Sequence, residues 1–280
     1  MSTSLQRTYR NLRVGIAGTV VLLLVAVTIA AGGVGVLPSI SAYYYTGARN
    51  VFVGALVAAA VAIVVLSGRG LQRALLSAAG LFAPLIALVP TPVRAGTVPG
   101  YDDGCGAGTT CVPSAVIPDI EVGIATYLAV GALTVAVGVV ITFLGDTGSA
   151  ARNLPSLVIA SVVLLVVFAA WLAARTAFVM GAHLVAAVVF FGLFALAAVV
   201  NAFTRAGAQP AWRTALYWIV AVAMTVDIAV IIVVASTGGI VDAAVPPLLV
   251  GEVVALVLFV VFWVLQSIEK WDDADPSVAA

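Results

Sequence analysis

The sequence has little charge for its length. Charged side chains make up only 9% of the 280 residues, against roughly 25% in an ordinary soluble protein. Apolar residues make up 64%, the mean hydropathy is +1.24, and no polar block is large enough to form a separate water-soluble domain. These properties exclude a soluble globular protein and indicate that a lipid bilayer surrounds most of the fold.

Several chemical signatures are also scarce. The 12 basic and 12 acidic residues cancel, so nothing predicts a nucleic-acid partner. One histidine, two cysteines and widely spaced carboxylates do not make a zinc site of three or four ligands. The single lysine, Lys270, lies near the C-terminus, and no glycine-rich phosphate loop is present. We therefore expect no cofactor and no ATP-driven activity by this chain alone.

Long apolar runs dominate what remains. Eight uncharged runs predict eight transmembrane helices in one domain over 1–280, at about 14–36, 51–67, 71–90, 122–144, 154–173, 177–201, 214–236 and 246–266. About 20 helical residues cover the roughly 30 Å of bilayer hydrocarbon, and only the run at 51–67 is short for this. The runs are continuously apolar, which favours an all-α integral membrane bundle over a barrel.

The basic residues predict the orientation of this bundle. With a cytoplasmic N-terminus, nine basic residues fall inside and only three fall outside, namely Arg49, Arg94 and Arg175. The positive-inside rule then predicts that both termini and the tail 267–280 are cytoplasmic, and that loop 91–121 is extracytoplasmic. We expect a multi-pass protein of the inner (plasma) membrane. The loop contains both cysteines, Cys105 and Cys111, and its location permits a disulfide between them.

Few ionisable side chains lie well inside predicted spans: His183 in the sixth, Asp227 in the seventh and Glu252 in the eighth. Their helical positions predict depths of about 9, 14 and 9 Å from the outer ends. A shared cluster would let a carboxylate orient the histidine, or let two carboxylates hold a proton or cation. The alternative is that Asp227 or Glu252 is neutral and bonds locally within the bundle.

A second concentration of polar residues follows the first predicted span. Pro38 ends that span, and the next 12 residues contain Ser39, Ser41, Tyr43, Tyr44, Tyr45, Thr46, Arg49 and Asn50. One interpretation is an aromatic belt at the membrane surface, with Arg49 reaching the headgroups. The other is a binding site that includes Tyr43, Tyr45 and Arg49, in which Arg49 pairs with Asp227 or Glu252 or holds an anionic headgroup.

The segment SISAYYYTGARNVFVGAL also carries a resemblance. A span ending in P-x-I-S, a short polar loop and then F-x-G resembles the Frag1/DRAM type of polytopic membrane protein and its bacterial relatives. The resemblance covers mainly residues 36–68 and is weaker at HLVAAVVFFGLFAL and GEVVALVLFVVFW. It implies a role in lipid handling or sorting and assigns no catalytic residue. Members of that group typically have about six spans, whereas eight are predicted here.

Three functional hypotheses follow. The first is an outward-facing polar pocket that binds a lipid headgroup or small amphiphile, with membrane lipids as partners. The second is a transporter or channel coupled to a proton or cation through Asp227, Glu252 and His183. The third is a hydrolase or transferase in which Ser39 or Ser41 reaches His183 and a carboxylate orients the imidazole. The sequence favours a protein that is not an enzyme.

Overall fold

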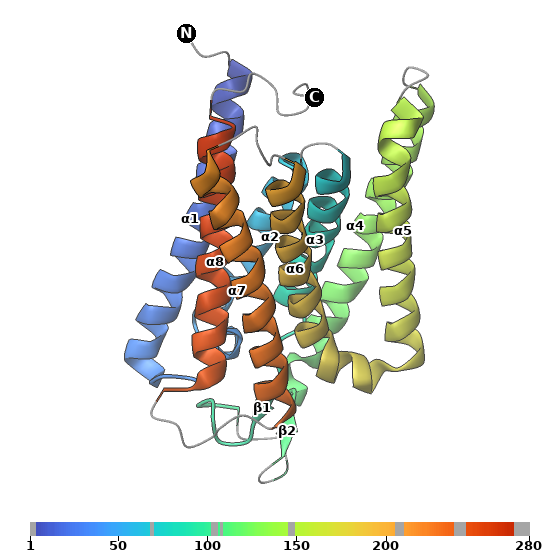
Figure 1. Cartoon of the computed structure of the whole chain (residues 1–280). Coiled ribbons are helices and arrows are strands. Elements are labelled where there is room, and N and C mark those ends of the chain that lie inside the picture. The colour runs from blue at the N-terminus through green and yellow to red at the C-terminus, as the bar shows by residue number, and fades with distance from the viewer. Residues whose placement is uncertain are drawn as a thin grey trace.

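The computed structural model describes residues 4–67, 70–101, 106, 109–144, 149–204, 210–237 and 245–271. This part of the chain is almost entirely helical (Figure 1). Its long helices are α1 (Ser4–Val34), α2 (Arg49–Val65), α3 (Gly70–Leu88), α4 (Ile117–Leu144), α5 (Ser149–Ala173), α6 (Arg175–Thr204), α7 (Ala211–Ser236) and α8 (Pro247–Glu269). Two short 3-10 helices, η1 (Ser41–Tyr45) and η2 (Ser114–Val116), and two strands, β1 (Val93–Arg94) and β2 (Thr110–Cys111), lie in the connections.

The helices match the predicted spans. Within the described residues, seven of them are long and apolar enough to cross a membrane, and α2 is shorter at 17 residues. The prediction of an all-α membrane bundle is confirmed, and the chain is an integral, multi-pass membrane protein. The short span predicted at 51–67 is also the short helix of the structure, which begins at Arg49 and ends at Val65.

Most of the helices form a closed ring. Around the ring, each of α1, α2, α3, α6, α7 and α8 packs against the next, and α8 returns to α1. Helices α4 and α5 form a hairpin outside the ring, where they pack mainly against each other and against α3 (Figure 1). Helices α3 and α6 contact each other directly in the ring. The α4–α5 hairpin therefore lies between them in the sequence but not in space.

Glycine allows the closest helix contacts. A Cβ atom at Gly131 or Gly138 of α4 would lie 2.5 Å from Leu164 and 2.6 Å from Leu157 of α5, respectively. Both leucines fit against α4 only because these two positions lack a side chain. Small residues that admit a neighbouring helix are a common packing device in lipid, where hydrophobic burial does not drive helix association.

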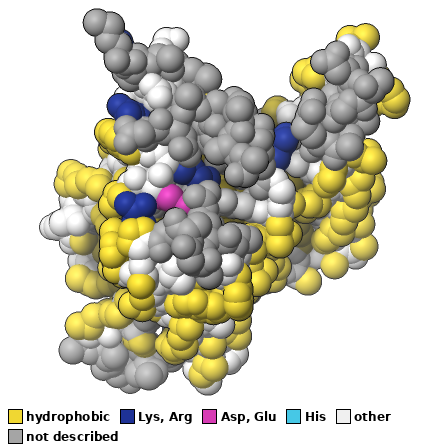
Figure 2. Space-filling view, turned by 45° about the horizontal axis from the view of Figure 1, so that its top comes forward, with side chains coloured by type: hydrophobic (Ala, Val, Ile, Leu, Met, Phe, Trp, Pro, Cys, Tyr) yellow, Lys and Arg dark blue, Asp and Glu magenta, His cyan; other side chains and the backbone are white. Residues whose placement is uncertain are grey.

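The two ends of the described chain lie at the same end of the helix bundle. The Arg13 Nη1 atom donates a 2.6 Å hydrogen bond to the Lys270 carbonyl, and Arg10 Nε donates one of 2.7 Å to the Trp271 carbonyl. The start of α1 and the end of α8 are thus adjacent, as an even number of spans requires. Figure 2, turned so that this end comes forward, shows basic side chains near it and hydrophobic side chains along the sides of the molecule. We call this the terminal end.

The opposite end carries the strands β1 and β2, so we call it the loop end (Figure 1). There the adjacent tyrosines are buried and fix the chain instead of forming an exposed belt. Tyr43 donates to the Gly35 carbonyl and accepts from the Leu37 amide, both at 3.1 Å, and Tyr45 donates to the Thr91 carbonyl at 2.7 Å. Burial raises the pKa of the Tyr45 hydroxyl, which therefore stays a hydrogen-bond donor.

Candidate functional site

A cavity of about 830 Å³ lies inside the ring toward the loop end. Helices α1, α2, α6, α7 and α8 form its walls, and the segments at 38–42 and 91–97 contribute at the loop end. Its deeper walls are apolar and include Val20, Leu23, Leu56, Val188, Phe191, Ile228, Leu256 and Phe259. Toward the loop end polar side chains join apolar ones such as Met180, Val234 and Leu248; the polar ones are Ser39, Ser41, Thr91, Arg94, Thr97, Thr110, His183 and Glu252. The cavity is therefore amphipathic along its length.

Glu252 and Ser41 form the polar contact that crosses from α8 to η1. The Ser41 hydroxyl donates to Glu252 Oε1 at 2.5 Å, and the Ser41 amide donates to Oε2 at 3.2 Å. Ser39 supports this arrangement, because its Oγ accepts from the Ala42 amide at 3.0 Å and lies 3.3 Å from Ser41 Oγ. One serine thus binds both carboxylate oxygens, and the partly exposed side chain of Glu252 lines the cavity.

His183 lines the same cavity from α6 but bonds elsewhere. Its Nδ1 lies 2.8 Å from the Val89 carbonyl oxygen. A carbonyl only accepts, so Nδ1 carries a proton and donates it to this contact. In the described part of the chain, no hydrogen bond joins His183 to Ser39 or Ser41. The geometry therefore lacks the nucleophile–base contact that serine catalysis needs.

Asp227 does not join this group. It lies on α7 with its side chain facing α8, where its Oδ1 would be 3.5 Å from a Cβ atom placed on Gly251. Its Oδ2 atom is buried and has no hydrogen-bond partner among the described residues. Asp227 is absent from the cavity lining, which does include its neighbour Ile228. The expected cluster of three ionisable residues thus forms only in part, with His183 and Glu252 sharing a cavity.

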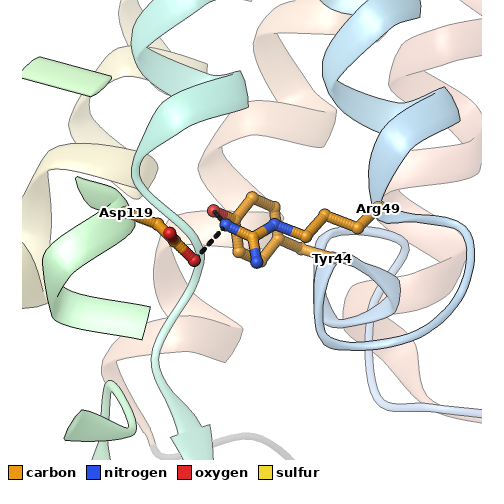
Figure 3. A network of polar contacts seen from close by, with 3 residues as sticks. All are labelled: Tyr44, Arg49 and Asp119. Atoms are coloured by element: carbon orange, nitrogen blue, oxygen red, sulfur yellow. Dashed lines mark hydrogen bonds and ion pairs between the residues drawn. The ribbon is translucent and has the colours of Figure 1, made fainter. Parts of the chain in front are cut away.

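Arg49 has partners other than the expected ones. Its Nη2 atom donates 2.8 Å hydrogen bonds to the Tyr44 hydroxyl and to Asp119 Oδ2 (Figure 3). The guanidinium carbon also lies 4.5 Å from the centre of the Tyr44 ring. The predicted pairing of Arg49 with Asp227 or Glu252 is therefore wrong. Asp119 lies in the first turn of α4, at the loop end. Its position in the sequence just before an apolar run could have indicated that it lies at this surface.

Arg49, Tyr43 and Tyr45 are absent from the lining of the cavity. Their contacts hold the loop end together, as described above for both tyrosines. Cys105 lies outside the described residues, so its pairing with Cys111 stays a prediction.

Aromatic side chains fill the ring between the cavity and the terminal end, and the sequence pattern alone did not lead us to predict this group. Phe194 of α6 is fully buried, with ring centres 4.8 Å from Phe259 and 5.4 Å from Phe262. Phe190 and Trp263 complete this group, which we call the aromatic floor. Repetition of aromatic residues at intervals of three and four along both helices could have indicated it.

A polar network lies beyond the aromatic floor, toward the terminal end. Tyr217 donates to Glu269 Oε2 at 2.8 Å, and Gln266 Nε2 donates to the Tyr217 hydroxyl at 2.9 Å. Gln72 of α3 reaches Gln266 at 3.3 Å. These contacts join α3, α7 and α8 in this half of the ring.

Comparison with known proteins adds no assignment. No family model, no curated protein and no solved structure matches the chain. The resemblance to the Frag1/DRAM type therefore stays a prediction. The class that the fold defines is a multi-pass membrane bundle with an amphipathic cavity inside its ring.

Proposed function

We propose that the protein binds a lipid or small amphiphile with a single apolar chain inside this cavity. The observation that supports the proposal is the change along the lining, from apolar walls beside the aromatic floor to a loop end where hydroxyl, imidazole, guanidinium and carboxylate groups join the apolar side chains. An amphiphile has the same change along its own length. The volume of about 830 Å³ falls in the range of small-molecule sites, roughly 300–1,000 Å³.

The proposal includes an orientation. We infer from the distribution of basic residues that the terminal end faces the cytoplasm and the loop end faces outward. The cavity would then open toward the extracytoplasmic side of the inner membrane, on the same side as loop 91–121 and the proposed Cys105–Cys111 disulfide. Ligand would enter from the outer leaflet or from outside the cell.

The alternative functions have weaker support. The binding site of a transporter needs access from both sides of the membrane. Here the aromatic floor fills the ring between the cavity and the terminal end. Its proposed coupling group would also include Asp227, which does not line the cavity. A serine enzyme would need Ser39 or Ser41 against His183, and in the described residues Ser41 donates to Glu252 instead. Binding without chemistry fits these contacts best.

A matched pair of substitutions on α6 tests the proposal. Val188 lines the cavity, whereas Val185, nearly one turn earlier, is 59% exposed on the outer surface of the helix. Val188→Trp should fill the cavity and abolish retention of a dodecyl amphiphile by the purified protein, measured by native mass spectrometry. Val185→Trp adds the same side chain at the lipid-facing surface and should retain the ligand. Equal retention by the two variants would refute the proposed site.

A further inference from the structure

The charge of the lining suggests which headgroup the cavity accepts. Glu252 is the acidic residue that lines it, and among the described residues it has no ion pair. The Ser41 amide and hydroxyl donate hydrogen bonds to its carboxylate, and Ser41 is neutral. A carboxylate inside a bilayer is costly unless a positive partner offsets it. A ligand that brings a positive charge to this position would supply that partner.

The position of Glu252 fixes where the charge must lie on the ligand. Glu252 and Phe259 both line the cavity from α8 and are seven residues apart, which is about 10 Å along the helix. The wall between them is apolar, with Ala255 and Leu256. An alkyl chain that bends to fill the cavity between Glu252 and the aromatic floor would place its first carbon, and any group attached to it, beside the carboxylate.

An inorganic cation fits these contacts less well. Hard cations seek six or more oxygen ligands, whereas Glu252 is surrounded by the amide and hydroxyl donors of Ser41. Those donors already bond to the carboxylate oxygens. An ammonium group needs only one open side of the carboxylate, and its chain also uses the apolar walls.

We propose that the ligand is a single-chain cationic amphiphile whose ammonium group pairs with Glu252 while its alkyl chain lies against the apolar walls. This inference rests on the proposed function, because it names the headgroup of the ligand for the same cavity. Arg94 also lines the cavity, from β1, but its side chain is exposed to the surroundings at the loop end. Its charge is therefore screened more strongly by water and salt than that of the partly buried Glu252.

The test compares headgroups on one chain length. Dodecyltrimethylammonium, dodecanol and dodecanoate are titrated separately into the full-length protein in a neutral maltoside detergent, with binding followed by native mass spectrometry. We expect the ammonium compound to bind at least about tenfold more tightly than dodecanol, as for a charge pair removed from water. Dodecanoate should bind most weakly. An equal or reversed ranking would overturn the inference.

Variants then assign the preference to one residue. Glu252→Gln should reduce the preference for the ammonium compound over dodecanol to within about twofold, whereas Glu252→Asp keeps the charge and should keep most of the preference. Glu121→Gln is the matched control, because Glu121 pairs with Arg175 and is absent from the cavity lining. A preference that persists in Glu252→Gln, or that disappears in Glu121→Gln, would refute the role of Glu252.

The two proposals fail in different ways. If none of the three compounds binds the wild-type protein, or if Val188→Trp binds them all as the wild type does, the proposed function is wrong. If dodecanol binds and Val188→Trp blocks it, but the ammonium compound has no advantage, only the inference about the headgroup is wrong. If Glu252→Gln does not fold, the order in which the three compounds bind to the wild type and to Glu252→Asp decides whether the inference about the headgroup holds.

Discussion

The two halves of the ring are built from the same helices but pack differently. Toward the loop end, α6 and α8 present Val188, Leu256 and Glu252 to an open cavity. Toward the terminal end, the same two helices present Phe194 and Phe262 to each other at 5.4 Å. The difference shows that this ring does not need a filled interior along its whole length. Aromatic side chains fill the ring toward the terminal end, whereas the ring surrounds an open cavity toward the loop end.

The largest difference between the halves should appear when a phenylalanine is removed. Phe194→Ala in the aromatic floor should lower the free energy of unfolding by about 3 kcal/mol or more, because it leaves a void in a filled region. Phe191→Ala, on the same helix but already at the cavity, should cost clearly less. Unfolding of both variants in mixed detergent micelles measures the difference. Equal losses would mean that the cavity is filled in the folded protein.

A smaller effect is expected when volume is added. Ala187 and Ala198 are three helical turns apart on α6; the first lines the cavity and the second is completely buried. Ala198→Leu should cost about 1–3 kcal/mol by overpacking. Ala187→Leu should cost less than about 1 kcal/mol, because the added atoms enter open space. Thermal midpoints of the two purified variants test this, and a larger loss for Ala187→Leu would contradict the comparison.

The smallest effect should come from the surface ion pair at the loop end. The side chains of Arg49 and Asp119 remain 31% and 52% exposed, respectively. Asp119→Asn should therefore change the unfolding free energy by at most about 1 kcal/mol, and less at high salt. It should leave amphiphile binding intact, in contrast to Val188→Trp. Loss of binding in Asp119→Asn would indicate that Arg49, and not Glu252, defines the polar part of the site.

The sequence was enough to predict the helices and part of the site. Apolar runs define where each span begins and ends, since the bilayer requires about 20 apolar residues per helix. Ser39, Ser41, His183 and Glu252 were all expected toward the outer side of the bundle, and all of them line the cavity. The depth of a residue in the membrane follows from counting residues along its helix, so the sequence alone was enough for these predictions.

The rotation and order of the helices were not accessible in the same way. Successive helical residues point about 100° apart, so Ile228 faces the cavity while Asp227 faces α8. Hydropathy did not reveal this, because most faces of α7 are apolar. The order of the ring was equally hidden, since α3 packs against α6 and the α4–α5 hairpin lies outside. For this reason Asp119, 70 residues after Arg49, was not recognised as its partner.

Photo-crosslinking tests the central claim most directly. A dodecyltrimethylammonium analogue with a diazirine at the end of its chain would be irradiated with the wild-type protein, and the labelled peptides identified by mass spectrometry. The account predicts labels between positions 184 and 191 of α6 and between 255 and 259 of α8, all removed by excess unlabelled compound and by Val188→Trp. Labels confined to the outer surfaces of α4 and α5, or unaffected by competition, would contradict it.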